Sequence, residues 1–366
     1  MKVVCTQENL KSGLLTVGRI ISSSTTLPIL NNILIKTENG SLKISSTNLE
    51  IAITTHIRCK IEEEGEVTVL SKTITELVNT LPNKNITLQT QNNQLSIEAE
   101  NYHTSIKTLP AEEFPLIPEV EGKGNLKIEA QEFKAGIDQV VFAVSTNQTQ
   151  PEIAGVLFSF GDKVLKIAAT DRYRLAEKKI TLGEKRQTEQ EIIVPQKTVL
   201  ELSRIIANQK GEVEMVFGET QIAISFLGTQ IISRVIDGQY PDYEQIIPKS
   251  FATTVVTEKL GLINALRAAG IFSQSTHSVK LEFNAEKEKL TLTTEAQDLG
   301  KSTVELGAKI EGGSGAVILN HHYVLDCLNS IQSSNVIIKI IDDSSPSLIL
   351  PEGQDDYIYL VMPIKS

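Results

Sequence analysis

The sequence contains no tryptophan, and among its 366 residues only 5% are aromatic and only three are cysteine. Cys5, Cys59 and Cys327 are odd in number, far apart and outside any CxxC pair, so the sequence supports neither a disulfide framework nor a zinc site. No apolar run reaches the ~18 residues that a membrane span requires, and the first residues lack the apolar region of a signal peptide. We therefore expect a reduced, cytoplasmic protein.

Motifs of catalysis are also missing. The sequence contains no GxSxG, GxxxxGK[ST] or GxGxxG, and its five histidines have no HExxH or comparable ligand spacing. Adjacent residues on a helix point in different directions, so we expect His321 and His322 to be surface residues rather than metal ligands. The sequence thus predicts a protein without catalytic residues, cofactor or metal. The alternative is an enzyme that uses an acidic pair, either Asp342-Asp343 or Asp355-Asp356.

One pattern occurs three times along the chain. Each copy starts with a short strand and an amphipathic helix, continues through a hairpin to a second helix, and ends in further strands. The first helices begin at Glu8, Glu132 and Glu258, and the second helices begin near Lys72, Lys197 and His321. Because these positions recur at intervals of 124 to 126 residues, we predict an α+β fold of three similar domains. The expected boundaries are residues 1–120, 121–250 and 251–366.

Six helices are expected from apolar residues that recur on one face. Their ranges are 8–22, 72–81, 132–144, 197–207, 258–272 and 322–331. Between the helices, pairs of apolar runs joined by turn residues predict hairpins, for example the run around Ile35, the turn Asn39-Gly40 and the run around Leu42.

A dense group of charges follows one of the predicted strands, at Thr170-Asp171-Arg172-Tyr173-Arg174. Such a group is either a solvated turn or a recognition surface. The corresponding hairpin positions in the other two copies, 47–50 and 294–297, lack the arginines. The fold therefore does not require this charge, which favours recognition.

The net charge of −10 argues against a simple nucleic-acid-binding protein. The predicted helical segments together carry +2, however, whereas the remainder of the chain carries −12. This segregation has the correct sign for a protein that meets phosphate only with its helices. The basic residues on these helices are Lys11, Arg19, Lys72, Lys134, Lys197, Arg204, Lys259 and Arg267.

The ordered motifs resemble the bacterial DNA polymerase III beta subunit family, the DNA sliding clamps. The matching stretches are residues 26–32, 47–50, 108–115, 170–176, 237–243, 323–326 and 361–364, and they span the chain in family order. The resemblance implies a non-catalytic processivity factor, in which two chains of three DNA-clamp domains form a head-to-tail homodimeric ring. Helices would line the hole, and duplex DNA would pass through without being read by sequence.

The resemblance also implies a groove that binds short peptide motifs of the replicative polymerase, the clamp loader and repair polymerases. Carried over by motif, its residues are Thr170, Arg172, Tyr173, Arg174, Leu175, Pro241, Ile246, Pro346, Val361, Met362, Pro363 and Ile364. The subunit interface would use Ile106 from one chain and Ile271 and Phe272 from the other. The sequence departs from the family at Arg172-Tyr173, Ser24-Thr25-Thr26 and Lys365-Ser366. The alternative function is a repeat-built peptide-binding scaffold that does not encircle DNA.

Overall fold

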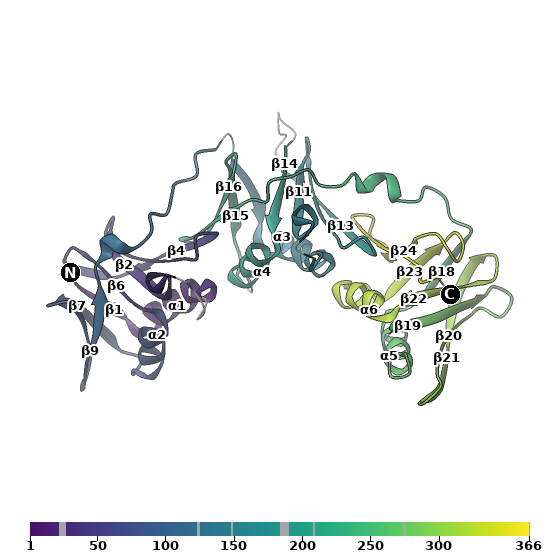
Figure 1. Ribbon diagram of the computed structural model, residues 1–366, viewed down its shortest axis with the longest axis horizontal. Helices are drawn as coiled ribbons and strands as arrows, with labels where there is room; N and C mark the ends of the chain where they lie inside the picture. The colour runs from purple at the N-terminus through teal and green to yellow at the C-terminus, as the bar shows by residue number, and fades with distance from the viewer. Residues whose placement is uncertain are drawn as a thin grey trace. The chain divides into compact units, whose positions relative to one another are not determined.

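The computed structural model describes residues 1–21, 27–122, 125–147, 149–183, 190–207, 209–273 and 276–365. The chain forms two compact units, one of Met1–Gln131 with Leu200–Val235 and one of Glu132–Val199 with Ile236–Ser366. Each unit is built on one extended antiparallel sheet (Figure 1). Both units include part of the central repeat, so the boundaries 1–120, 121–250 and 251–366 stay a prediction. Among the described residues, no helix is long and apolar enough to cross a membrane.

All six expected helices are present. They are α1 (Gln7–Val17), α2 (Ser71–Thr80), α3 (Ala130–Asp138), α4 (Gln196–Ile205), α5 (Lys259–Gly270) and α6 (His321–Ser330). The first helix of the first two repeats is shorter than expected, because it gives way to 3₁₀ turns at Gly18–Ile20 and Val141–Ala143. The expected helix end at Ser22 lies outside the described residues.

The first helix of each repeat buries the same two positions against its sheet. Leu10 and Leu14 of α1, Phe133 and Ile137 of α3, and Leu262 and Leu266 of α5 are almost fully buried. These positions are four residues apart, so they lie on one face of each helix. The internal repeat of the sequence is thus a repeat of packing as well.

The sheet of the first unit contains 13 strands in the order β10-β15-β16-β17-β4-β3-β2-β6-β9-β8-β7-β1-β5. The bounds are β1 (Lys2–Thr6), β2 (Asn32–Glu38), β3 (Ser41–Thr47), β4 (Ile51–Arg58), β5 (Lys60–Glu63), β6 (Glu66–Leu70), β7 (Asn85–Gln91), β8 (Gln94–Ala99), β9 (Tyr102–Leu109), β10 (Asn125–Glu129), β15 (Glu212–Phe217), β16 (Gln221–Phe226) and β17 (Thr229–Arg234). The expected hairpin turn joins β2 and β3, and Asn39 and Gly40 both have the positive φ angles that a tight hairpin turn requires.

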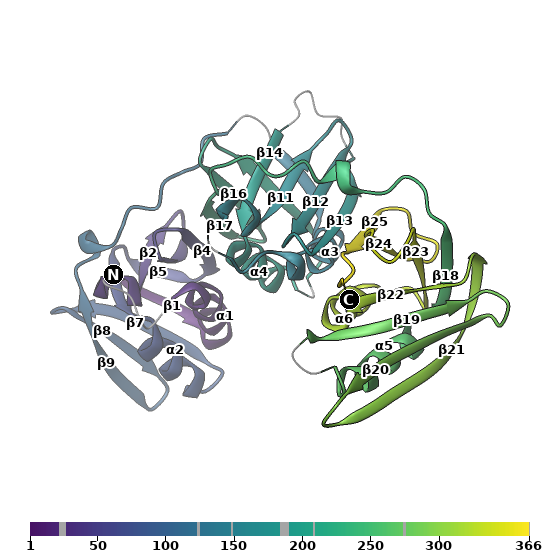
Figure 2. The same cartoon turned by 45° about the vertical axis from the view of Figure 1, so that its right-hand side comes forward.

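The sheet of the second unit contains 12 strands in the order β14-β11-β12-β13-β25-β24-β23-β18-β21-β20-β19-β22. The bounds are β11 (Gly155–Phe160), β12 (Val164–Thr170), β13 (Arg174–Thr181), β14 (Gln190–Pro195), β18 (Thr253–Glu258), β19 (Ser278–Asn284), β20 (Lys289–Ala296), β21 (Gly300–Gly312), β22 (Gly315–Asn320), β23 (Asn335–Ile340), β24 (Ser347–Pro351) and β25 (Tyr357–Val361). Helices α5 and α6 contact each other, and they also contact strands β19, β20 and β22 (Figure 2).

Each sheet is continuous because a strand of one repeat pairs with a strand of the next. In the first unit β4 pairs with β17, and in the second β13 pairs with β25. Both junctions carry the same backbone bonds at one end, since Arg234 N–H donates to Glu50 O and Met362 N–H donates to Tyr173 O. Successive repeats are therefore joined by an equivalent antiparallel pairing, and this pairing positions the candidate site.

Candidate functional site

The charged segment after β12 forms a turn that is held by its own side chains. The Thr170 hydroxyl donates to Arg174 O at 2.7 Å and accepts from Arg172 N–H. Asp171 Oδ1 accepts the N–H groups of Tyr173 and Arg174, each at 3.0 Å. Arg172 adopts a left-handed backbone with φ of +79°. This turn leaves the side chains of Arg172 and Tyr173 exposed, with Tyr173 63% exposed.

Arg174 points inward and joins the second and third repeats. Its Nε donates to Asp171 Oδ2 at 3.0 Å, and its two terminal nitrogens donate to Asp326 Oδ2 at 2.5 Å and to Phe142 O at 2.8 Å. The guanidinium also lies 4.4 Å from the ring centre of Tyr323. With its side chain only 11% exposed, Arg174 supports the exposed residues of the turn from below, and its contact with a peptide stays a prediction.

The end of the chain lies beside this turn. Strand β25 pairs with β13, so that Val361 lies opposite Arg174 and Leu360 opposite Leu175. Val361 is fully buried, whereas Met362 is 38% exposed. Beyond it, Ile364 N–H donates to Ile318 O at 2.8 Å. Met362 is therefore not a core residue, and it lies next to Tyr173 at the surface.

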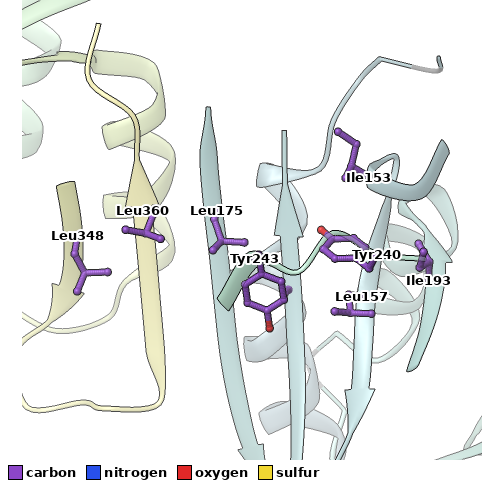
Figure 3. Packing of buried hydrophobic residues seen from close by; sticks show 9 residues of the cluster. Ile153, Leu157, Leu175, Ile193, Tyr240, Tyr243, Leu348 and Leu360 are labelled. Carbon is purple, nitrogen blue, oxygen red and sulfur yellow. The ribbon is translucent and has the colours of Figure 1, made fainter. Parts of the chain in front are cut away.

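The segment between the second and third repeats crosses the same part of the sheet. Tyr240 and Tyr243 are buried and pack in one cluster with Leu175, Leu348 and Leu360, and Figure 3 shows these side chains gathered over neighbouring strands. The Tyr243 hydroxyl donates to the buried carboxylate of Glu177 at 2.5 Å. Burial and the neighbouring Glu177 raise the pKa of Tyr243 well above its usual value, so its hydroxyl remains protonated and donates.

The twelve predicted groove residues therefore separate by depth. Thr170, Leu175 and Val361 are buried, and Arg174, Pro346, Pro363 and Ile364 are half-buried. The exposed ones are Arg172, Tyr173, Pro241, Ile246 and Met362. We call these five residues the junction surface, because they lie around the β13–β25 pairing and the linker that crosses it.

Sequence reasoning missed the partners that hold Arg174. Asp326 is 152 residues away along the chain, and it occurs in the motif at 323–326 without any sign of its role. Phe142 supplies a carbonyl oxygen, which no sequence pattern marks. Tyr359 packs 5.9 Å from the Phe142 ring and donates its hydroxyl to Tyr323 O. Only the folded chain brings these groups around one guanidinium.

The eight basic helix residues also differ in availability. Arg19, Lys72, Lys197 and Arg267 are exposed, and Lys11 is half-buried. Lys134 is paired with Asp138, Arg204 with Glu201, and Lys259 donates to Ile331 O at the end of α6. Arg204 is also exposed but has Glu201 as its partner, so Arg19, Lys72, Lys197 and Arg267 are the stronger candidates for phosphate contacts.

The predicted interface residues lie in different units of the chain. Ile106 is in β9 and is 8% exposed, whereas Ile271, just after α5, is 70% exposed and Phe272 is half-buried. An exposed isoleucine of this size fits a contact with another chain. Ser24, Thr25, Thr26 and Ser366, where the sequence departs from the family, lie outside the described residues.

His321 differs from its expected place on the surface, because it is only 5% exposed. Its ring packs against Gly270, where a Cβ atom would come within 2.7 Å of His321 Nε2. His322 is exposed, as expected. The two rings are nonetheless neighbours, with centres 4.1 Å apart.

Comparison with known proteins agrees with this architecture over the whole chain. Models of the DNA polymerase III beta subunit match in order, the N-terminal domain at residues 1–118, the central domain at 127–242 and the C-terminal domain at 244–365. The chain is 29% identical to the beta sliding clamp of Synechocystis sp. over 100% of this chain and 99% of that protein. It is 26% identical to the beta sliding clamp of Bacillus subtilis over the full length of both.

Solved structures show the same fold. The crystal structure of the DNA polymerase III subunit beta from Pseudomonas aeruginosa superposes with a TM-score of 0.96 at 27% identity and covers 100% of both chains. These matches define a chain of three clamp domains with an α+β fold. The chain belongs to the DNA polymerase III beta subunit family. The class of function that follows is a beta sliding clamp, a non-catalytic processivity factor, rather than a peptide-binding scaffold or an enzyme.

Proposed function

We propose that two copies of this chain close into a head-to-tail ring around duplex DNA and tether the replicative polymerase, the clamp loader and repair polymerases through the junction surface. The ring would act in the cytoplasm. The observation that carries this proposal is the pairing between repeats. Two junctions within the chain use corresponding strands in the same register, and each of the two strands that would form a third junction has a segment that pairs on one side only among the described residues.

The free edges are found by aligning the repeats. Strands β4 and β13 correspond to the first part of β21, and β17 and β25 correspond to β9. Residues 300–307 of β21 pair with β20 on one side, and residues 102–107 of β9 pair with β8 on one side. Within the part of the chain that the structure describes, neither segment has a strand on its other side. A second copy would supply each missing neighbour.

The register of the third junction follows from the other two. Three equivalent hairpin pairs are Ser46–Ile53, Ala169–Ala176 and Thr294–Ser302. Three equivalent pairs on the opposing strands are Leu95–Ile106, Ile222–Ser233 and Ser347–Val361. In the existing junctions, the residue two positions before Ile53 pairs with Ser233, and the residue two positions before Ala176 pairs with Val361. Gly300 of one chain should therefore lie opposite Ile106 of the other, and Ser302 opposite Thr104.

The exposed Ile271 fits the same junction. Phe142, which follows α3, packs against Tyr359 of β25 at the junction of the second and third repeats. By the alignment of α3 with α5, Ile271 occupies the place of Phe142, and Thr104 the place of Tyr359. Ile271 of one chain would thus cover Thr104 and the neighbouring Ile106 of the other, as the predicted interface requires.

A cross-link tests the register. The Met362 N–H bond to Tyr173 O flanks the Arg174–Val361 pair, so that pair is not hydrogen-bonded, and every second pair shares this property. Ser302 and Thr104 should also form such a pair, in which the side chains are close enough for a disulfide. We expect the double variant Thr104→Cys with Ser302→Cys to give, on mild oxidation, a covalent species of twice the 40.2 kDa chain mass.

The matched control shifts one partner by a single residue. Thr104→Cys with Thr303→Cys places the two thiols on opposite faces of the sheet, so it should cross-link poorly, as should the unmodified chain with its own three cysteines. Equal yields from both double variants would refute the register. A solution mass of one chain at micromolar concentration would refute the ring and favour the scaffold.

Binding to DNA requires phosphate contacts from the exposed basic helix residues. Lys197→Glu with Arg267→Glu should weaken association and reduce the salt slope by roughly 0.9 for each phosphate that the variant no longer neutralises. Lys60→Glu, an exposed strand residue outside the predicted set, is the control. A ring also predicts retention on circular but not on linear DNA after loading. Equal retention on both forms would exclude encirclement.

The junction surface is tested with a clamp-binding peptide of the replicative polymerase. Tyr173→Ala and Met362→Ala remove exposed side chains, so they should leave the fold intact while weakening peptide binding about 10-fold or more, as hot-spot truncations do. Leu227→Ala, which truncates a 66% exposed leucine in the other unit, should have no effect. Unchanged affinity in both junction variants would place the peptide site elsewhere.

A further inference from the structure

Three histidines from distant parts of the third repeat come together at the start of α6. His277 immediately precedes β19, and His321 and His322 are the first two residues of α6. The ring centre of His322 lies 4.6 Å from that of His277 and 4.1 Å from that of His321. One ring nitrogen from each residue lies within 4.8 Å of the others. We refer to His277, His321 and His322 as the histidine cluster.

Backbone hydrogen bonds hold the histidine cluster in place without a ligand. His321 N–H donates to His277 O at 2.9 Å, which ties the start of α6 to the start of β19. His277 itself adopts a left-handed backbone with φ of +51°, a conformation in which histidine is found several-fold more often than most residues. The N-cap residue Asn320 accepts His322 N–H through its side chain. The three side chains are therefore carried by an ordered turn and a capped helix end.

His321 is already in the form that a metal ion requires. Its Nδ1 lies 2.8 Å from His277 O, a carbonyl oxygen that can only accept, so Nδ1 carries the proton and Nε2 keeps its lone pair. Metal-binding histidines generally donate their second N–H to such an oxygen. Gly270 has no side chain that would cover Nε2.

The other two rings can complete the set. Tetrahedral zinc, with Zn–N bonds of 2.0–2.1 Å, needs nitrogen atoms roughly 3.4 Å apart. The present separations are within 4.8 Å, so closing on an ion requires movements of about an ångström. His277 and His322 are both exposed, and exposed side chains change rotamer readily. The buried His321 would be the fixed ligand, and the other two would turn toward it.

We propose that the histidine cluster is a zinc site, with three imidazole ligands and a water molecule in the fourth position. Three neutral nitrogens and no thiolate suit zinc, copper or nickel rather than magnesium or calcium, which prefer oxygen. The ion would connect the residue that precedes β19 with the first turn of α6, in addition to the backbone bond between them. The positive end of the α6 dipole opposes a cation there, but this effect is small and screened by solvent.

The alternative is that the three rings only stack. Their tilted and edge-on arrangement is one that aromatic side chains adopt without a metal. The two explanations differ in a measurable way, because stacking gives no affinity for zinc and no change in stability when zinc is added.

The test uses the full chain after chelator treatment. Titration with zinc, followed by calorimetry, should give one ion per chain, and cobalt should produce the visible absorption of tetrahedral nitrogen coordination. His277→Gln and His322→Gln each remove one exposed ligand, so each should weaken zinc binding by at least 10-fold. Zinc should raise the melting temperature of the wild-type chain, because it binds the folded form, and the rise should be lost in both variants.

Matched controls remove potential ligands outside the cluster. His103→Gln and Cys59→Ser change a histidine and a cysteine in the first repeat, and both should bind zinc as the wild type does. The proposal is overturned if the wild type binds no zinc at a free zinc concentration of about 100 µM, which is far above the dissociation constants of established zinc sites. It is also overturned if either glutamine variant retains wild-type affinity, or if His103→Gln or Cys59→Ser abolishes binding.

Discussion

Replacing Arg174 by methionine should loosen the pairing between the second and third repeats. The substitution keeps much of the apolar side chain but removes three donors, which bind Asp171, Asp326 and the Phe142 carbonyl. It also leaves Asp171, whose side chain is 15% exposed, without its cation. The strands that meet above this residue, β13 and β25, should therefore open more often.

The free-energy cost of Arg174→Met depends on how exposed each partner of Arg174 is. A hydrogen bond to a charged group contributes about 1.5–3 kcal/mol, and breaking a buried ion pair costs about 3–5 kcal/mol. The three bonds do not add in full, because the Asp326 side chain is 43% exposed and regains water when its partner is removed. We expect about 3 kcal/mol, which corresponds to roughly a 150-fold change in an equilibrium constant.

Native-state hydrogen exchange measures this opening directly. Amide protection of Leu175 and Leu360, which lie opposite each other in β13 and β25, should fall by roughly 100-fold in Arg174→Met. Arg172→Met is the matched control, because it removes an exposed arginine from the same turn, and it should change protection by less than about 2-fold. Equal effects of the two substitutions, or wild-type protection in Arg174→Met, would refute the supporting role of Arg174.

Two further substitutions test how the linker and the third repeat are held. Tyr243→Phe leaves the buried carboxylate of Glu177 without its 2.5 Å donor and should cost about 1–3 kcal/mol, seen as faster proteolysis of residues 237–251. Glu244→Gln, which removes only an exposed ion pair with Lys166, should cost no more than about 1 kcal/mol, and linker cleavage at the same rate in both variants would contradict the proposed anchor. Gly312→Ala should lower the denaturation midpoint strongly, because φ is +109° and a Cβ atom would lie 2.1 Å from Ala252 O. At Gly313 an added Cβ atom meets nothing within 4 Å, so Gly313→Ala should change the midpoint little. Equal midpoints would refute this steric argument.

The helices and hairpins could be predicted because their signals are local. An apolar face in each helix and the Asn39-Gly40 turn depend on residues that are near each other in the sequence, and all six helix starts lie within two residues of their predicted positions. The 3₁₀ turns after α1 and α3 were missed, since the apolar pattern continues through them. Helical periodicity alone does not show where a helix tightens into a 3₁₀ turn.

The candidate site was only partly predictable, because its contacts join residues that are far apart in the sequence. The motif at 170–175 marks the correct turn, but the inward position of Arg174 depends on Asp326, which is 152 residues away. In the same way, His321 was expected at the surface because its contact with His277 spans 44 residues. The charge of Arg174 suggested a recognition residue, and the adjacency of His321 to His322 suggested a solvent-exposed residue. Tertiary contacts determine both positions.

The three strand junctions, two within the chain and one proposed between chains, have different side chains at equivalent positions. In the first, Ile53 lies opposite Ile231 and both are almost fully buried. In the proposed third junction the same positions hold Ser302 and Thr104. Burying an isoleucine contributes about 1.5–3 kcal/mol, whereas a cross-strand serine–threonine pair contributes about 0.2–1 kcal/mol. The proposed junction between subunits would therefore be weaker than the first junction, so a closed ring would open between its two chains while the first and second repeats stay joined.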